Sequence, residues 1–369
     1  MYYFIFSLFL LYACGLYLII DRFKNKNLQL IYVFTLSALS VILALRPENV
    51  PDFQSYKYIF EVTNWSNNYT INILAREPIS ATEYGFVGLV LLYKTVFGNT
   101  FRLFLFLIDI VTLHFTVQFI RKIIEMYKRK ERNVSIKILL LFFPYYGLYY
   151  QGIAIRSAIS IMFIMMTLYY FLDKKYSKSL GACFAGFLFQ RITIIAIVLC
   201  IAYRYFPVLK KQWYMLFSII FLGFTAVCNI THGKVMGQVY YFLNIILRKV
   251  FSLVNYNGYL DRADTSRIID KKRLFIIVLF FVIALFVDNK NKIKKFLNML
   301  FISCVLIFAT LSIVGAERIY DVFSLFFIPI ICIEEYTVEK HRKLVMQIIA
   351  LFSMFCNFII AVRIWLYPA

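Results

Sequence analysis

The chain alternates between long apolar runs and short polar segments almost from end to end. The run over residues 152–172 is typical, because at about 1.5 Å of rise per residue, roughly 20 helical residues cross the hydrocarbon core of a bilayer. Comparable runs begin at residue 2 and recur up to residue 365. Only helices and closed barrels satisfy their backbone in lipid, so the pattern predicts an all-α, polytopic membrane protein with about 12 transmembrane helices.

The charges between the runs determine the predicted sides of the membrane. Lysines and arginines cluster within residues 22–26, 121–132, 174–178 and 290–295, and an excess of such residues is typical of cytoplasmic loops. Placing these clusters inside satisfies nearly every loop and puts both termini outside. The outer face is then left with only a few cations.

Residues 84–97 form a short, weakly apolar segment that contains Gly85, Gly88 and Lys94. If this segment crossed the membrane, the next span, residues 101–120, would deliver the basic cluster that follows it to the outer side. That arrangement contradicts the positive-inside rule. The pattern therefore predicts a re-entrant or interfacial helix at this place.

Two polar stretches, residues 46–83 and 231–273, are much longer than the other connections. Both are predicted to be outer loops, and loops of such length are more often functional than idle. Within the second, apolar positions at helical spacing over residues 239–250 predict an amphipathic helix lying on the membrane. Since no internal repeat or flexible linker interrupts the chain, residues 1–369 are predicted to form a single integral membrane domain.

The composition argues against a soluble domain and against nucleic-acid binding. Of the 369 residues, 62% are hydrophobic, and the formal net charge is +21. The basic residues lie mostly between apolar spans, where membrane topology and anionic lipid account for them. The seven cysteines and three histidines show neither metal-ligand spacing nor a disulfide framework. We therefore expect no metal, no cofactor and no nucleic-acid partner.

Arg156 carries the strongest functional signal in the sequence. It lies about one turn inside the start of the run 152–172, on the predicted outer side, where a guanidinium must snorkel, pair or face water. Ala154, Ser157 and Ala158 around it are small and leave room beside the charge. We interpret Arg156 as a ligand for an outward-facing anion. The alternative is an interfacial arginine that snorkels to lipid headgroups.

Three further cations are predicted at the same outer level. Arg46, Arg191 and Arg318 lie at or near the ends of spans, and Gln190 directly precedes Arg191. The predicted topology allows several of these side chains to converge on one cavity.

Three carboxylates are candidates for a general base: Asp52, Glu83 and Glu317. Each also has a purely structural explanation. As a lone loop carboxylate, Asp52 is by default a solvated residue before any family argument, and Glu83 can cap the first turn of the segment after it. Glu317 adjoins Arg318 and is equally consistent with a plain ion pair.

Outward-facing arginines match the chemistry of a diphosphate. Their planar forks bind phosphate oxygens bidentately and offset the charge without a metal. A diphosphate attached to a lipid is a good leaving group for glycosyl transfer if a carboxylate takes the proton of the attacking hydroxyl. The chain contains no Walker loop, GxSxG elbow, HExxH motif or paired-carboxylate signature that would favour another reaction.

Five short motifs occur in order along most of the chain. They are RPENVPDFQSY from Arg46, EYGF from Glu83, AIRSAIS around Arg156, FLFQRITI up to residue 194 and ERIYDVF from Glu317. In this order and spacing they resemble the EpsG-like branch of the Wzy-type bacterial polymerases of O-antigen, capsule and exopolysaccharide. The resemblance implies a glycosyltransferase that joins repeat units carried on undecaprenyl diphosphate at the outer face of the bacterial cytoplasmic (inner) membrane.

The resemblance also directs the choice of site residues. Asp52 or Glu83 is the expected base, with Glu317 third, and Arg156 and Arg318 are expected to bind the diphosphate. The full set of expected diphosphate and glycan ligands is Arg46, Tyr56, Arg156, Gln190, Arg191 and Arg318.

The chain departs from the family pattern at Gln190, where relatives usually carry a histidine. An amide can hydrogen-bond substrate but cannot carry a proton. The partners that the resemblance implies are the undecaprenyl-diphosphate-linked glycan, membrane lipid, and flippase and chain-length regulator proteins.

Other functional classes stay open at this point. A flippase or transporter of lipid-linked oligosaccharides would place charges along a path through the bilayer midplane and show repeats, whereas here the charge gathers at one face. A glycan ligase would share the arginines and differ only in its acceptor. A membrane acyltransferase would need a histidine within a span, where only His114 lies.

Overall fold

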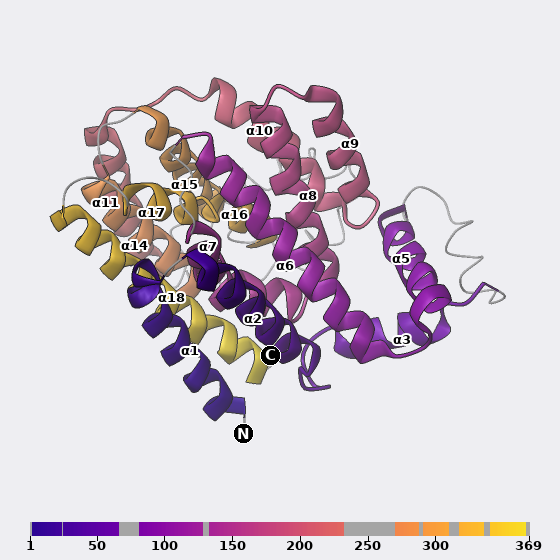
Figure 1. Cartoon of the computed structure of the whole chain (residues 1–369). Helices are drawn as coiled ribbons and strands as arrows, with labels where there is room; N and C mark the ends of the chain where they lie inside the picture. The colour runs from indigo at the N-terminus through magenta and orange to yellow at the C-terminus, as the bar shows by residue number, and fades with distance from the viewer. Residues whose placement is uncertain are drawn as a thin grey trace. The chain divides into compact units, whose positions relative to one another are not determined.

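The computed structural model describes residues 2–23, 25–65, 81–127, 133–231, 270–287, 291–309, 317–335 and 340–366. Every regular element within these ranges is a helix (Figure 1). The predicted all-α class is therefore confirmed for the described part of the chain.

The chain divides into two compact units, Met1–Cys200 together with Ala350–Ala369, and Ile201–Ile349. The helices α10 (Ile195–Tyr205) and α18 (Lys340–Leu366) each contribute residues to both units. The single domain expected over residues 1–369 stays a prediction.

The first unit contains most of the predicted site residues. Its other helices are α1 (Tyr2–Ile19), η1 (Ile20–Arg22), α2 (Asn25–Ala44), α3 (Phe53–Val62), α5 (Ala81–Phe97), α6 (Phe101–Glu125), α7 (Val134–Phe142), η3 (Phe143–Gln151), α8 (Ile155–Leu172), α9 (Tyr176–Phe187) and η4 (Arg191–Ile194).

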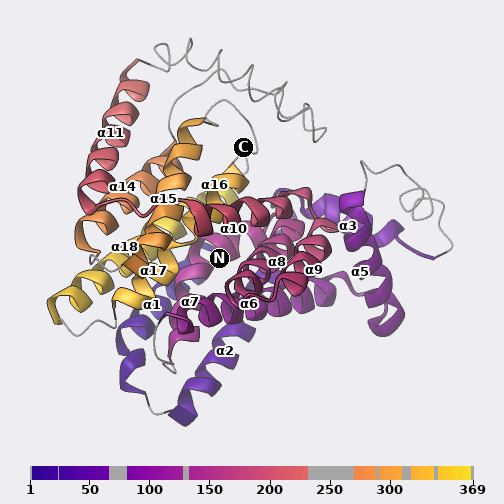
Figure 2. The ribbon, with the colours of Figure 1, turned by 90° about the horizontal axis from the view of Figure 1, so that it is seen from above.

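The long helix α6 organises this unit by packing against both α2 and α8 (Figure 1). Its buried positions, from Phe104 through Ile108 and Thr112 to Ile124, recur at helical spacing. Such a stripe is what a helix needs to pack against its neighbours along its whole length. The short helices α3 and α5 lie together at one end of α6 (Figures 1 and 2).

The predicted span 136–150 is divided between α7 and η3, which is a π-helix. At its end the indole of Trp365 donates to the Leu148 carbonyl at 2.7 Å. Gly152 follows directly, and a Cβ there would overlap both the Trp365 ring and that carbonyl. The bend between η3 and α8 therefore depends on a residue without a side chain.

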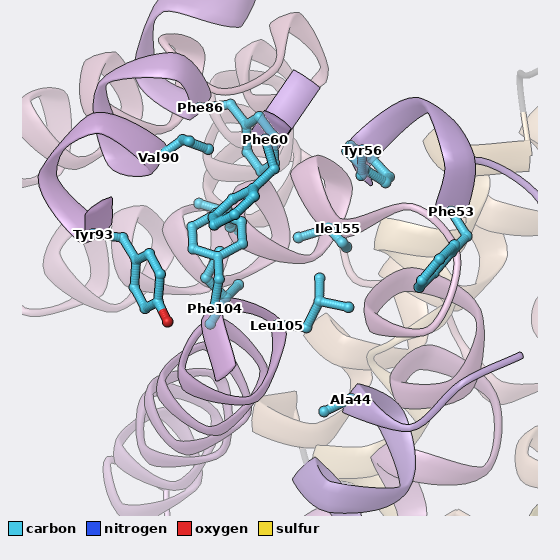
Figure 3. Close-up of a cluster of buried hydrophobic side chains, with 12 residues drawn as sticks. Ala44, Phe53, Tyr56, Phe60, Phe86, Val90, Tyr93, Phe104, Leu105 and Ile155 are labelled. Carbon is cyan, nitrogen blue, oxygen red and sulfur yellow. The ribbon is translucent and has the colours of Figure 1, made fainter. Parts of the chain in front are cut away.

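The first predicted outer loop is partly helical. The helix α3 buries Phe53, Tyr56 and Phe60, which share one face at three- and four-residue spacing. The Phe60 ring lies 5.2 Å from that of Phe104 on α6, and Phe86 on α5 joins the same cluster (Figure 3). A polar loop is the expectation from composition; the aromatic stripe instead folds the segment back onto α5 and α6.

Five described helices are long and apolar enough to cross a membrane, so the predicted count of about 12 spans is not confirmed. The expected re-entrant segment forms part of α5 and contributes a shorter apolar helix, Tyr84–Phe97. The predicted run 319–333 is divided between α16 and α17, and the run 192–205 between η4 and α10. The five candidate spans are Asn27–Ala44, Phe101–Glu125, Ile155–Leu172, Lys211–Ile230 and His341–Trp365.

In the second unit, α14 packs against both α11 and α15, and α15 contacts α16 and α17. The Tyr214 hydroxyl hydrogen-bonds the Asn298 amide, which joins α11 to α15. The predicted amphipathic helix over residues 239–250 lies outside the described residues. The bounds in this unit are α11 (Lys211–Ile230), α14 (Lys271–Phe286), α15 (Asn291–Ala309), α16 (Glu317–Ser324) and α17 (Phe327–Glu334).

Candidate active site

Arg156 lies in the first turn of α8, directly after the bend at residues 152–154. Its side chain is half-buried, and its guanidinium carbon lies 5.9 Å from the centroid of the Tyr56 ring on α3. A cation within about 6 Å of an aromatic ring is attracted by the ring quadrupole. The structure thus places this arginine against a ring from another helix, which an arginine that only snorkels to headgroups does not require.

The helix that carries Tyr56 also carries Asp52. The N–H of Tyr56 donates to the Asp52 carbonyl at 3.0 Å, so the two residues lie one helical turn apart. Tyr56 is buried, whereas Asp52 is exposed and has a φ of 63°, a left-handed conformation that Asp tolerates better than most residues. A solvent-accessible carboxylate is therefore positioned one turn from the ring that contacts Arg156.

The first turn of α5 is tied to the segment that follows α9. The N–H of Gly85 donates to the Leu188 carbonyl at 3.0 Å, and a Cβ on Gly85 would lie 2.9 Å from that carbonyl oxygen. The neighbouring ring of Phe86 lies 5.4 Å from Tyr56 (Figure 3). The backbone of Glu83, two residues earlier in α5, comes to the same junction; its side chain lies outside the described residues.

The packing of α9 on α8 brings Gln190 alongside the middle of α8. The Ser179 hydroxyl donates to the Thr167 carbonyl at 2.9 Å, and further along the pair the rings of Phe163 and Phe189 stack at 5.9 Å. The two helices are antiparallel, and these contacts put Gln190 near Phe163 of α8, about two helical turns after Arg156. That Gln190 lies level with Arg156, as the charge pattern predicts, stays a prediction.

Several buried polar atoms on α8 and the segment after α9 lack a hydrogen-bond partner within the described ranges. Gln190 Oε1, Ser157 Oγ and Thr193 Oγ1 are shielded from solvent and have no hydrogen-bond partner among the described residues. Ser157 follows Arg156 in the chain, and the half-buried Arg191 follows Gln190. Because a buried polar group without a partner costs about 1–3 kcal/mol, a bound hydroxyl or phosphate oxygen would be stabilised here.

Arg46 is engaged by the protein itself. Its guanidinium donates to the carbonyls of Gln151 and Gly152, the latter at 2.7 Å, and lies 3.1 Å from the Asp109 carboxylate. Burial lowers the pKa of this guanidinium, and Asp109 partly offsets the shift. The sequence predicts Arg46 as a diphosphate ligand. The structure gives it the geometry of a positioning residue beneath the bend from which Arg156 projects.

Glu317 and Arg318 begin α16 in the second unit. The Lys272 ammonium lies 2.8 Å from the buried Asp321 carboxylate and 5.2 Å from the centroid of the Tyr320 ring. These contacts hold the first turns of α16, where Arg318 is half-buried. The side chain of Glu317 lies outside the described residues.

The segments that carry these residues fall within one family match. The EpsG family model matches residues 29–367. The chain belongs to the EpsG family. This is the family of the Wzy-like polysaccharide polymerases, so the predicted family is confirmed. No curated protein and no solved structure matches the chain.

Membership in the EpsG family indicates the general class of function. The family is associated with glycosyltransferase-like polymerase activity in polysaccharide biosynthesis, and a polymerase of this kind takes a lipid-linked glycan. The five apolar helices agree with a membrane protein. The membrane location and the general class of reaction that the sequence predicts therefore agree with the family.

Asp109 and Gly85 are the main residues at the site that the sequence did not select. A carboxylate in an apolar span is a signal that a partner exists, but the sequence does not say which cation provides it. For Gly85 the deciding contact, with Leu188, comes from a distant segment. His114, in the same span as Asp109, has its ring nitrogen 3.1 Å from the Tyr32 hydroxyl, which gives it a structural partner.

Proposed function

We propose that this EpsG family member joins oligosaccharide repeat units carried on undecaprenyl diphosphate, by metal-independent glycosyl transfer. The observation that carries the proposal is the contact between the Arg156 guanidinium and the Tyr56 ring, one helical turn from Asp52. This contact brings the Arg156 guanidinium to the helix that begins at the exposed Asp52, and we take the two as the anion ligand and the base. Transfer from a lipid diphosphate needs both groups.

In the proposed reaction, a sugar hydroxyl of the incoming lipid-linked unit attacks the anomeric carbon at the reducing end of the growing chain. A new C–O bond forms while the bond from that carbon to the diphosphate oxygen breaks. The growing chain thereby moves to the incoming unit, and undecaprenyl diphosphate leaves. The proton of the attacking hydroxyl goes to a carboxylate.

Asp52 is our first choice for that carboxylate. It is exposed and lies at the start of the helix that contacts Arg156. Glu83 is the second choice, because its backbone reaches the junction of α5 with Leu188. Glu317, at the start of α16 in the other unit, is the third.

The arginines supply the electrostatic part of the proposed mechanism. As the glycosidic bond breaks, negative charge develops on the leaving diphosphate, and a guanidinium fork offsets that charge with two parallel hydrogen bonds. Arg156 is the principal ligand, with Arg318 and Arg191 assisting. Gln190 hydrogen-bonds the glycan through its amide, so the proton passes to a carboxylate and not to this position.

We place the reaction at the outer face of the bacterial cytoplasmic membrane. The placement rests on the positive-inside rule, which leaves Arg156 on the side opposite to the lysine clusters. A flippase would then supply the lipid-linked units, and a chain-length regulator would act on the product.

Deletion of the gene, followed by analysis of lipid-linked glycans, tests the proposed function. We expect single repeat units to accumulate on the outer leaflet and full-length polymer to return when the wild-type gene is restored. Units trapped on the inner leaflet would identify a flippase instead. Lipid-linked polymer of normal length that is not transferred to its final acceptor would identify a ligase.

A further inference from the structure

A groove lies between α5, α6 and α8 of the first unit, next to the Arg156 site. It encloses about 570 Å³, which falls within the roughly 300–1,000 Å³ that pockets for small ligands occupy. The volume is enough for one segment of a long chain and too small for the whole of it.

The groove has a buried floor and an exposed rim. The floor residues Phe104, Ile108 and Ile159 are 1%, 7% and 3% exposed, whereas Leu92 and Val96 on α5 are 63% and 62% exposed. Since α6 and α8 are candidate membrane spans, lipid acyl chains are the expected surroundings of this exposed apolar rim. A hydrocarbon chain can therefore enter from the bilayer.

The lining offers no hydrogen bond to a ligand. Two of its residues carry a hydroxyl, and both hydroxyls are already used: Tyr93 donates to the Thr100 carbonyl at 3.0 Å, and Thr112 donates to the Ile108 carbonyl at 2.7 Å. A sugar in this groove would lose its hydrogen bonds to water without replacement. The chemistry of the lining thus favours hydrocarbon and disfavours the glycan.

The groove and the proposed diphosphate site share neighbouring residues. Ile159 of the floor lies one turn after Arg156 on α8, and Phe189 of the lining directly precedes Gln190. An occupant that satisfies both places has an anionic head at Arg156 and a hydrocarbon chain that continues along the groove.

We propose that this groove holds the polyprenyl segment next to the diphosphate of the lipid-linked substrate. The proposal rests on the proposed function, because it takes the diphosphate to lie at Arg156. Lipid tails are as apolar as the lining, so the groove gains little from the hydrophobic effect. Its contribution is packing and orientation, which align the anomeric carbon with the attacking hydroxyl.

Photolabelling of the full chain in vesicles of phosphatidylethanolamine and phosphatidylglycerol tests this proposal. The probe is undecaprenyl diphosphate without sugar, carrying a diazirine on an isoprene unit near the diphosphate. We expect label in peptides of α5 and α6. Unlabelled undecaprenyl diphosphate should displace it, and added phosphatidylglycerol should not. Equal displacement by both lipids would mean general lipid contact and overturn the proposal.

Matched variants on α6 locate the binding. Ile108→Trp fills the floor and should lower labelling by roughly tenfold, the change that about 1.4 kcal/mol produces. Leu103→Trp adds the same bulk to a residue of the same helix that is 40% exposed and does not line the groove, so it should label like the wild type. Equal labelling of the two variants overturns the proposal. If Ile108→Trp does not fold, Leu92→Trp at the exposed rim takes its place.

The labelling result and the polymerase result are separable. The label could be specific to the groove while deletion of the gene leaves polymer length unchanged. That result would refute the proposed polymerase function and support lipid binding in the groove. Deletion could instead cause single repeat units to accumulate while Ile108→Trp leaves the labelling unchanged. That result would support the polymerase function and refute lipid binding in the groove.

Discussion

The guanidinium of Arg46 and the carboxylate of Asp109 form an ion pair of 3.1 Å in which each side chain is only 1% exposed. The same guanidinium holds the carbonyls of Gln151 and Gly152 at the bend before α8. Gln151 and Gly152 are buried, so their carbonyls need a protein partner. The pair therefore supports the position from which Arg156 projects.

The first prediction concerns that pair. Asp109→Ala leaves the Arg46 charge buried without its carboxylate and should lower the free energy of unfolding by about 3–5 kcal/mol. Denaturant unfolding of the purified protein in lipid nanodiscs measures this. The control is Glu48→Ala, because Glu48 is 56% exposed and pairs with the partly exposed Arg102 at 3.7 Å and Lys57 at 3.8 Å; such exposed pairs contribute only about 0–1 kcal/mol. Equal losses in the two variants would contradict the prediction.

The second prediction compares two glycines of α5. Gly85→Ala forces a methyl group against the Leu188 backbone, where a Cβ would lie 2.9 Å from the carbonyl oxygen, and such overpacking costs about 1–3 kcal/mol. It should separate α5 from the site and shorten the polymer that complemented cells make. Gly88→Ala, where a Cβ meets nothing within 4 Å, should preserve polymer length. Hydrogen exchange of the α5 amides should rise only in Gly85→Ala.

The third prediction concerns Arg156. Arg156→Ala should lower the rate of polymerisation in vesicles by about 10²–10³, as expected for loss of one donor to a developing charge. Arg156→Lys keeps a charge but loses the planar fork, so it should also be poor. Lys178→Ala, an exposed cation of the predicted inner face, should retain the wild-type rate. Full-length polymer made by Arg156→Ala in cells would refute the assigned role.

Two variants of Tyr56 distinguish the contribution of its ring from that of its hydroxyl. Tyr56→Phe preserves the face that the Arg156 guanidinium contacts at 5.9 Å, so its rate should stay close to that of the wild type. Tyr56→Leu removes the ring and should approach the loss seen in Arg156→Ala. If instead Tyr56→Phe is as inactive as Tyr56→Leu, the hydroxyl and not the ring is what the site uses.

The fourth prediction tests whether Arg156 and Arg318 act on one diphosphate. Groups that stabilise the same transition state are non-additive, so the double variant Arg156→Ala/Arg318→Ala should be little slower than the worse single variant. The measurement is a double-mutant cycle: initial rates of polymerisation in vesicles for the wild type, the two single variants and the double variant. Losses that multiply would mean that the two arginines act independently, and would separate Arg318 from the diphosphate.

The sequence predicted the helical class and many helix positions, because apolar runs bounded by charge are strong signals. The run 28–45, for example, corresponds to α2 (Asn25–Ala44). Whether each apolar run forms one continuous helix was harder to predict. Pro144 lies in the run that becomes α7 and the π-helix η3, and Pro329 lies in the run that becomes α16 and α17. Proline lacks an N–H and clashes with the preceding turn, so these two residues were usable signals of interruption.

The site was predictable only in part. The order of the motifs points to Arg156, Tyr56 and Asp52 as members of one site, and the structure brings Arg156 to Tyr56. The role of Arg46 could not be predicted from the sequence. A guanidinium at the end of a span can either bind a ligand or pair with a buried carboxylate. Only tertiary packing, which sets its contact with Asp109, distinguishes the two.

The hydrogen bond between Gly85 and Leu188 also constrains the order of assembly during synthesis. At about 5–20 residues per second, the ribosome makes the acceptor several seconds after the donor. During that interval the carbonyl that accepts from the first turn of α5 does not yet exist, whereas α6, on which Phe86 and Tyr93 of α5 pack, follows α5 directly in the chain. The bond that ties α5 to the end of α9 therefore forms only after the α8–α9 hairpin has been made, so α5 can pack on α6 before its first turn is secured.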